Sequence, residues 1–375
     1  MEKKKLNVAL VGYGFMGKAH STAYLEAQRV FDLPVTFEMA LIVGRNREAC
    51  DSMRTQWGWK RYVSDWKDAV ADPEIDLVDI ATPNFLHREI AVAAAEQKKN
   101  VFCEKPLGLN VNECREMVGA VEAAKVFHMI WHNYRKAPAI GLAKRLISEN
   151  RLGRIYHLRA RFLQSWQIDP KTPWRWLHQK QYAGSGVNGD LNAHLIDMSR
   201  YLVGEITQVC GMMETFVKER PDKTGAMVKV DVDDACSFLA RFENGAVGVI
   251  ESSRMSTGRM VNNCIEINGE HGALYWDFED MNSLYYFDNT EKPDRRGFKK
   301  IQALTAHHPY MEGHWSTNHA LGYANTFINT LREFAISYDK NENPSPNFYD
   351  GLKNQMVIDA VISSVEREKW IDIGE

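Results

Sequence analysis

The chain has few cysteines, and none of them forms the close pair that metal and redox motifs need. Its six cysteines are scattered over 375 residues without a Cys-x-x-Cys spacing. This pattern is typical of reduced thiols in a cytoplasmic enzyme rather than of disulfides or structural zinc. We therefore expect a cytoplasmic protein without a metal cofactor.

The chain also lacks long apolar runs and long basic runs. No run of about 20 apolar residues occurs, and the charged N-terminus leads directly into an expected strand, so we predict neither a membrane span nor a signal peptide. The net charge of −3 and the lack of a basic run beyond residues 3–5 make nucleic acid a poor partner. A hydrophobic content of 45% at this length favours two domains with substantial cores.

The most informative stretch is residues 6–21, LNVALVGYGFMGKAHS, which combines an apolar strand, a glycine turn and a helix start. The G-x-G-x-x-G spacing lets the backbone pass close to a pyrophosphate, which would meet the partly positive N-terminus of the following helix. A purely structural turn is the alternative. No Gly-Lys-Ser/Thr follows, so a nucleoside-triphosphate loop is not expected. The candidate cofactor-binding residues here are Gly12, Gly14, Phe15, Met16 and Gly17.

The end of the second expected strand, residues 38–43, bears on the choice between NAD and NADP. NAD-selective sites usually carry an acidic residue there, about 20 residues beyond the glycines, to bond the ribose 2′-hydroxyl. This chain has Gly44, Arg45 and Asn46 instead. Arg45 could pair with a 2′-phosphate or stack on adenine. The alternative is that Arg45 is a surface residue and that Asn46 caps a helix starting at Arg47. The residues alone therefore leave both NAD and NADP open.

Two later strands end in polar residues. Expected strands at residues 77–81 and 100–103 alternate with expected helices, which predicts a parallel sheet covered on both faces. Ligands of such sheets lie outside the carboxyl ends of the strands, so we assign both ends to the cofactor site. Taken alone, the first end is more typical of an ordinary turn and helix cap. The candidates are Thr82, Pro83, Asn84, His87, Glu104 and Lys105.

Lys105 is the residue of this group that we select for chemistry. Pro106 follows it, restricts the backbone and can adopt a cis bond, so the lysine could be held at a fixed angle toward the nicotinamide pocket. A solvated surface lysine is the alternative.

The period of the hydrophobic pattern changes in the second half of the chain, and we place a domain boundary after residue 131. Residues 155–166 alternate, with Arg159 and Arg161 on one face and Tyr156, Leu158, Ala160, Phe162 and Trp166 on the other, which predicts a half-buried antiparallel strand. Asn244-Gly245 predicts a hairpin. We expect a Rossmann dinucleotide-binding domain of class α/β over 1–131, and an α+β substrate-binding and oligomerisation domain over 132–375 with a large, open, mostly antiparallel sheet of about six strands. Its further strands are expected at 207–217, 235–242, 246–253, 263–268, 273–278 and 283–287.

The richest segment of the second domain is AGSGVNGDLNAHLIDMSRYLVGE, a glycine-rich approach followed by an expected helix over residues 190–203 that stops at Gly204. Asp190, His194 and Asp197 fall at i, i+4 and i+7, so they would share one face. An aspartate one turn from a histidine can orient the ring and raise its basicity, which suits a general base. A core histidine is the alternative, but the pairing with Asp190 favours catalysis.

The glycine motif, TPNFLH, CEKP and the Gly-Asp-x-x-x-His helix, in this order, resemble the Gfo/Idh/MocA oxidoreductases over nearly the whole chain, to DGLKNQMVIDAVISSVE. The Tyr-Arg-x-x-Pro element, the FLQSW strand end and the AGSGVNGDLNAHLID block are most similar to the subgroup that contains levoglucosan dehydrogenase and the glycoside 3-dehydrogenases. The resemblance implies NAD as cofactor, despite Arg45, and a homodimer or homotetramer. It also implies that Lys105, Asp190 and His194 act on the reacting hydroxyl.

From these observations we predict oxidation of a secondary ring hydroxyl of a pyranose sugar or glycoside, at C3 by the resemblance. Lys105 would stabilise alkoxide character at the oxygen, and His194, held by Asp190, would take the proton while hydride passes to nicotinamide. The alternatives are an inositol 2-dehydrogenase, a redox-neutral glycoside-processing enzyme with retained NAD, and a non-catalytic nucleotide sensor. The expected substrate-binding residues are Lys105, Tyr134, Gln164, Trp174, Arg175, Asp190 and His194, with Asp197, His307 and His308 as further candidates.

Overall fold

The computed structural model describes residues 3–315 and 318–374, and the chain divides into two compact units. The N-terminal unit comprises Met1–Asn133 and Gly322–Lys353, and the second unit comprises Tyr134–Leu321 and Asn354–Glu375. The N-terminal unit therefore includes a segment from late in the chain, whereas the sequence analysis assigned everything after residue 131 to the second domain. The later division falls within the helix α11 (Phe348–Arg367).

Within the described residues, the N-terminal unit is built on a parallel sheet of six strands in the order β3-β2-β1-β4-β5-β6. This is the strand order of a Rossmann fold. The strands are nearly continuous apolar runs because helices cover both of their faces. Their bounds are β1 (Lys4–Val11), β2 (Val35–Val43), β3 (Arg61–Val63), β4 (Leu77–Ile80), β5 (Asn100–Cys103) and β6 (His128–Ile130).

Two hydrophobic clusters flank this sheet, one under α1 and α10 and the other under α3, α4 and α5. Phe327, Leu331 and Phe334 of α10 are fully buried in the first cluster. Leaving this apolar stripe in water would be costly, so α10 joins the N-terminal unit although it follows the second domain in the chain. The helices of this unit are α1 (Phe15–Val30), α2 (Arg47–Trp57), α3 (Trp66–Ala71), α4 (His87–Glu96), α5 (Val111–Ala124) and α10 (Tyr323–Asp339).

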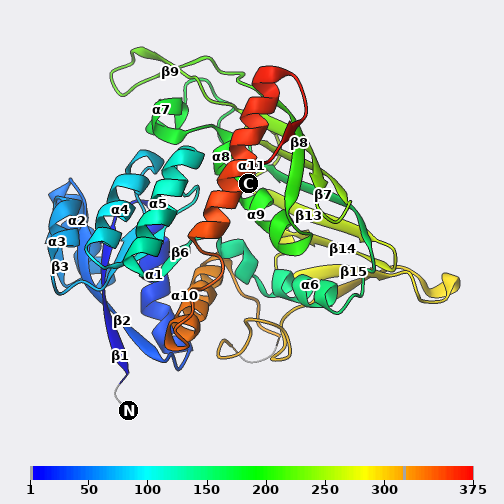
Figure 1. Cartoon of the computed structure of the whole chain (residues 1–375), viewed down its shortest axis with the longest axis horizontal. Helices are drawn as coiled ribbons and strands as arrows, with labels where there is room; N and C mark the ends of the chain where they lie inside the picture. The colour runs from blue at the N-terminus through cyan, green and yellow to red at the C-terminus, as the bar shows by residue number, and fades with distance from the viewer. Residues whose placement is uncertain (1–2, 316–317, 375) are drawn as a thin grey trace. The chain divides into compact units, whose positions relative to one another are not determined.

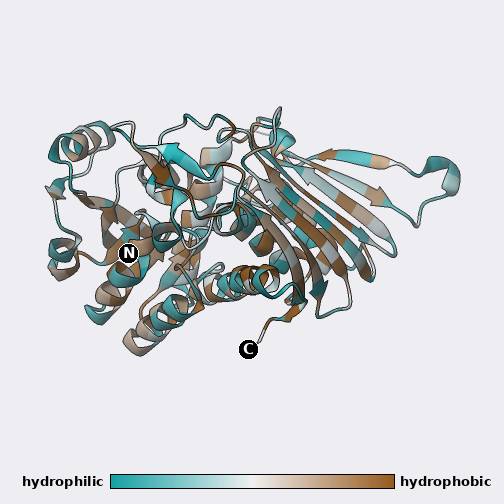
Figure 2. Cartoon of the chain, turned by 90° about the horizontal axis from the view of Figure 1, so that it is seen from above, coloured by the Kyte–Doolittle hydropathy of each residue, from teal (hydrophilic) through white to brown (hydrophobic). Residues whose placement is uncertain are grey.

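The second unit contains, in the described part of the chain, a sheet of nine strands in the order β16-β15-β14-β13-β7-β12-β11-β8-β17. Its neighbours are antiparallel except for β7 and β12, which are parallel. Helices α6, α8 and α9 pack along one face (Figure 1). Leu239, Val247 and Val249 point to the other face and stay exposed. Figure 2 shows the resulting alternation of hydrophobic and hydrophilic residues along the strands.

The bounds of β7, β8 and β11 to β15 lie close to the sequence expectations. The strands of the large sheet are β7 (Ile155–Leu163), β8 (Ile206–Glu214), β11 (Ala235–Phe242), β12 (Val247–Ser253), β13 (Asn262–Gly269), β14 (Gly272–Asp277), β15 (Ser283–Asp288), β16 (Phe298–Gln302) and β17 (Ile371–Asp372). A separate ribbon is formed by β9 (Glu219–Pro221) and β10 (Met227–Lys229), and the helices are α6 (Pro138–Ser148), α7 (Lys180–Ala183), α8 (Val187–Asp190) and α9 (Asn192–Leu202).

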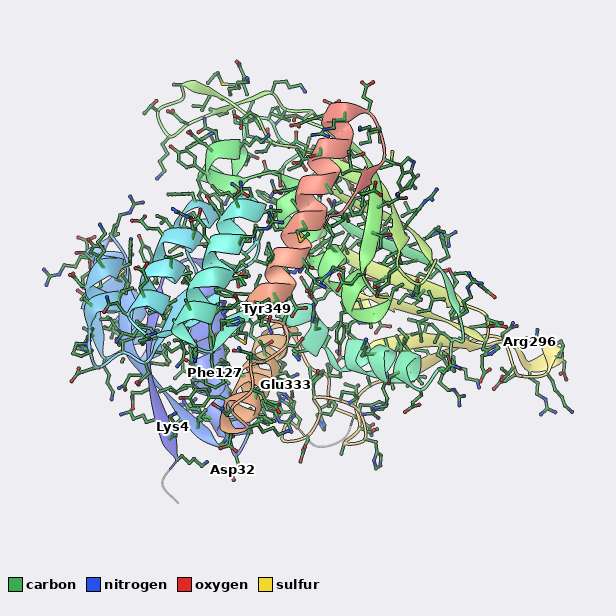
Figure 3. All side chains as sticks on the ribbon, viewed as in Figure 1. Lys4, Asp32, Phe127, Arg296, Glu333 and Tyr349 are labelled. Atoms are coloured by element: carbon green, nitrogen blue, oxygen red, sulfur yellow. The ribbon has the colours of Figure 1, made fainter. Side chains whose placement is uncertain are left out.

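The expected fold class is confirmed, but two details of the sheet are wrong. It has nine strands rather than about six, because the edge strands β16 and β17 are short and mostly exposed and so show no alternation. The hairpin that leads into β16 carries Arg296 into solvent (Figure 3). In β7, Tyr156 is 48% exposed rather than buried, because a register shift against β13 changes the alternation at the strand start. Trp166 lies beyond the strand and is 39% exposed.

Among the described helices, none combines the length and the apolar character that crossing a membrane requires.

Candidate functional site

The glycine turn joins β1 to α1, and its geometry leaves room for a phosphate group. Gly12 has a φ of +119°, and a Cβ on it would lie 2.4 Å from the carbonyl oxygen of Ala81, so only glycine fits. A Cβ on Gly14 would meet no atom within 4 Å. Gly14 is also the N-cap of α1 and has no side chain to cap it, so the first N–H groups of the helix remain available to an anion.

The strand ends selected from the sequence, at Gly12, Ala81 and Glu104, lie side by side at one edge of the sheet. We call this edge the rim. The N–H groups of Gly12, Ala81 and Glu104 each donate to the last carbonyl of the neighbouring strand, at 2.9–3.0 Å. In the rim, Thr82 Oγ1 is buried and has no hydrogen-bond partner among the described residues. A buried hydroxyl of this kind needs a partner, and the open space at Gly14 offers the pyrophosphate position, so these residues fit a dinucleotide.

The loop after β2 shows the capping role that the sequence allowed for it. Asn46 Oδ1 accepts a hydrogen bond from the N–H of Ala49 at 2.9 Å and caps α2. Gly44 is needed because a Cβ there would lie 2.2 Å from the ring of Tyr13. Arg45 is exposed, and a contact between its guanidinium and the cofactor stays a prediction.

A buried hydrogen-bonded network lies behind the rim. His20 of α1 is fully buried, with Nε2 2.9 Å from Glu104 Oε1 and Nδ1 3.1 Å from Asp79 Oδ2. Asp79 also accepts hydrogen bonds from the hydroxyl of Tyr24 and the indole N–H of Trp131, both at 2.9 Å. Burial lowers the pKa of His20, but the charge of Asp79 and the hydrogen bonds to both carboxylates outweigh burial and raise it to about 9. The imidazole is therefore a cation between two carboxylates.

The charge on His20 predicts a pH dependence of stability. Its pKa is raised from the ordinary 6.5 to about 9, so the stabilisation is complete below pH 6.5 and is lost as the pH rises through 9. We expect the free energy of unfolding from urea titrations to fall by roughly 3 kcal/mol over this range. His20→Gln should remove most of this slope. An equal slope in the variant and the wild type would show that other groups cause it.

Glu104 connects the network to the residue that we select for chemistry. Its Oε2 accepts a hydrogen bond from the backbone N–H of Lys105 at 3.1 Å, while its Oε1 faces His20. The Lys105-Pro106 peptide bond is cis, a possibility that the sequence analysis allowed. The Lys105 side chain itself is half-buried.

His87 lies at the rim, as expected. It is fully buried, and its two ring nitrogens lie 3.0 Å from the carbonyl oxygens of Pro106 and Thr82. Burial lowers the pKa of His87, and a neutral ring donates to only one of the two carbonyls. His87 therefore links the two rim loops, and a contact with the cofactor stays a prediction.

The second unit brings several predicted substrate-binding residues into one cluster. His194 is 8% exposed, and its ring packs edge-to-face on Tyr134 with the centroids 4.8 Å apart. Burial, and to a lesser extent the charge of Asp190, raises the pKa of Tyr134. Asp190, His194 and Tyr134 therefore lie close together, whereas Lys105 belongs to the N-terminal unit.

Asp190 is held by an arginine that the sequence analysis missed. Arg254 is buried, and its Nη2 lies 2.6 Å from Asp190 Oδ2. This ion pair offsets part of the carboxylate charge. Orientation of His194 by Asp190 stays a prediction. Arg254 directly follows β12, and this strand-end position is the signal that could have indicated it.

The single helix expected over residues 190–203 is wrong. Asp190 ends α8, and α9, which carries His194, begins after it, so the i, i+4, i+7 argument does not apply to Asp190. Asp197 is buried and accepts hydrogen bonds from Arg135 at 2.6 and 2.7 Å and from Asn354 at 3.0 Å. Asp197 is therefore part of a structural ion pair rather than a substrate contact.

The start of α8 has a tertiary cause. The Asp233 carboxylate accepts hydrogen bonds from the N–H groups of Gly186 and Asn188 at 2.6 and 2.8 Å. A Cβ on Gly186 would lie 1.8 Å from the Asp233 carbonyl oxygen. The glycine-rich approach thus serves close packing against a segment distant in the chain, which local periodicity does not reveal.

The remaining candidates lie beyond the end of β7. The guanidinium carbons of Arg175 and Arg254 lie 5.0 and 5.4 Å from the ring of Trp166, whose indole N–H donates to Gln164 Oε1 at 2.7 Å. The indole nitrogen of Trp174 is buried without a hydrogen-bond partner among the residues that the structure describes. Aromatic faces beside hydrogen-bonding groups suit a sugar, which has both apolar and hydroxyl surfaces.

His308 and the backbone of His307 make contacts within the protein. His308 Nδ1 lies 2.9 Å from Thr305 Oγ1, and the His307 carbonyl accepts a hydrogen bond from Arg145 at 2.9 Å. The His308 ring therefore has a structural contact, and a substrate contact of either side chain stays a prediction.

Comparison with known proteins gives matches along most of the chain. Residues 6–132 match the model of an oxidoreductase family with an NAD-binding Rossmann fold, and residues 140–275 match the GFO/IDH/MocA C-terminal domain. Levoglucosan dehydrogenase of Pseudarthrobacter phenanthrenivorans is 39% identical and is covered, like this chain, over 99% of its length. Glucose-6-phosphate 3-dehydrogenase of Bacillus subtilis is 27% identical over 94% of each chain.

A solved structure agrees with these matches. Levoglucosan dehydrogenase in complex with NADH and levoglucosan has a TM-score of 0.96 and 40% identity, over 99% of this chain and 100% of that one. The NAD-binding domain and the resemblance noted from the motifs are thereby confirmed. With both family models matched in order and a relative 39% identical along the full length, the chain belongs to the Gfo/Idh/MocA family of oxidoreductases.

Proposed function

We propose that this protein is an NAD-dependent sugar dehydrogenase that oxidises the C3 hydroxyl of a pyranose sugar or glycoside. The observation that carries the proposal is the full-length similarity to levoglucosan dehydrogenase. The similarity to a 3-dehydrogenase of glucose 6-phosphate supports the C3 position. A cytoplasmic location and a homodimer or homotetramer, both expected from the sequence, belong to the same proposal.

NAD, when bound, supplies the hydride acceptor, and the glycine turn and the rim would hold it. The ammonium of Lys105 stabilises the negative charge that develops on the reacting oxygen. His194 accepts the hydroxyl proton at Nε2, because its Nδ1 is buried. The edge-to-face contact with Tyr134 limits rotation of the imidazole.

In the same proposal, the groups beyond β7 bind the sugar. Gln164 and Arg175 offer hydrogen bonds to hydroxyl groups, and the rings of Trp166 and Trp174 offer apolar faces. Holding the ring in this way would direct one C–H bond toward the hydride acceptor.

A substrate panel tests the function. Purified protein is mixed with pyranoses, glycosides, levoglucosan and myo-inositol, with NAD and NADP separately, and the absorbance of the reduced nicotinamide is followed. We expect turnover with pyranose-type substrates and NAD, and a 3-keto product identified by NMR. Faster turnover of inositol would instead make the protein an inositol dehydrogenase. Copurified nucleotide without net NADH formation would indicate a redox-neutral enzyme.

A further inference from the structure

The buried network around His20 has no part in the mechanism above. We propose that His20 is a positioning residue, which acts through Glu104 to hold the backbone of Lys105 in place for the reaction. The inference rests on the proposed function, because it presumes that Lys105 acts on the substrate.

The Glu104 carboxylate links the two residues directly. One of its oxygens lies 2.9 Å from His20 Nε2, and the other accepts the Lys105 N–H at 3.1 Å. Glu104 is only 4% exposed, so water cannot readily replace either bond. A carboxylate with both oxygens engaged has one orientation, and turning it would leave a buried charge without a partner.

His20 is itself fixed from its other side. Its Nδ1 lies 3.1 Å from Asp79, which Tyr24 and Trp131 hold by hydrogen bonds. The imidazole also stacks on the indole of Trp131, with centroids 4.2 Å apart and planes at 26°. Because both neighbours of the ring are carboxylates, both nitrogens must donate, which only the protonated ring can do.

The consequence for Lys105 follows from this chain of contacts. Lys105 directly follows Glu104 at the end of β5, and its N–H is one of the two groups that hold the carboxylate. Loss of the His20 donor lets the Glu104 carboxylate turn. The backbone of Lys105, at the start of the loop after β5, is then no longer held in place. A misplacement of about 1 Å at a reacting group can cost about 10²-fold in rate.

Two substitutions of His20 separate positioning from stability. The amide nitrogen of glutamine falls near the position of Nε2 and keeps a donor for Glu104, whereas that of asparagine falls near Nδ1 and keeps a donor only for Asp79. Both remove the charge and one hydrogen bond, so they are matched in their structural cost. Trp59→Phe is a further control, because it removes the buried bond from Trp59 Nε1 to Ser21 Oγ, 3.0 Å long, on the same helix.

Steady-state kinetics and amide hydrogen exchange of the Lys105 N–H provide the readouts. We expect His20→Asn to lower kcat by about tenfold or more with KM values within about threefold, and His20→Gln to stay within about threefold of the wild-type kcat. The Lys105 amide should exchange at least about tenfold faster in His20→Asn than in His20→Gln. Trp59→Phe should lower the melting temperature without changing kcat.

Equal losses of kcat in the two His20 variants, or unchanged exchange at Lys105 in His20→Asn, would overturn the inference. If His20→Asn does not fold, Glu104→Ala removes both accepting oxygens and should speed exchange at Lys105 in the same way. Wild-type protein that turns over no sugar would refute the proposed function instead. The exchange measurement needs no substrate, so it still decides whether His20 holds the Lys105 backbone.

Discussion

Replacement of Lys105 by alanine is expected to lower kcat by about 10²-fold or more while NAD still binds. The ammonium is the group that we assign to the developing charge on the substrate oxygen, and alanine removes it. In the proposed function, backbone groups of the glycine turn would hold the cofactor, and the substitution does not touch them. Turnover at saturating sugar and NAD, together with NADH fluorescence titration, measures both parts.

Lys98→Ala is the matched control for Lys105→Ala. Lys98 is an exposed lysine of the same unit, and its ammonium donates to the carbonyl of Ala124 at 3.2 Å, so kcat should not change. His194→Ala should show a loss on the same scale as Lys105→Ala, because it removes the proposed base. Near-normal turnover in both Lys105→Ala and His194→Ala would overturn the assignment of the catalytic residues.

Removal of the Asp197 carboxylate is expected to destabilise the second unit by about 3–5 kcal/mol. Arg135 and Asp197 have side-chain exposures of 3% and 2%, with the closest nitrogen and oxygen 2.6 Å apart. Asp197→Ala leaves the Arg135 guanidinium buried beside the ring of Tyr201, 5.0 Å away, and without its carboxylate. Urea unfolding followed by tryptophan fluorescence measures the loss.

The double variant Arg135→Met/Asp197→Leu tests the cause of that loss. If the cost comes from an uncompensated buried charge, the double variant should be more stable than either single variant, since it removes both charges and keeps most of the volume. Single variants that lose less than about 1 kcal/mol would show that solvent reaches the pair and compensates it.

The elements that sequence patterns predicted best are those with local signals. The glycine turn is specified by spacing and by a positive φ at Gly12, and β11 and β12 meet at Asn244-Gly245, where Gly245 has a φ of +86°. Such signals depend on neighbours in the chain. The start of α8 had no local signal, because the carboxylate that binds the N–H groups of Gly186 and Asn188 there belongs to Asp233.

The sequence by itself determined the order of the two domains, the dinucleotide turn and the family, because these depend on periodicity and spacing along the chain. Tertiary structure alone decided that α10 belongs to the N-terminal unit, that Asp190 pairs with Arg254, and that His20 lies between two carboxylates. The partners in these contacts are tens to hundreds of residues apart. A hydrophobic pattern in the sequence indicates which side chains turn inward. The energy of a buried charge depends instead on the charged and hydrogen-bonding groups that surround it in the fold.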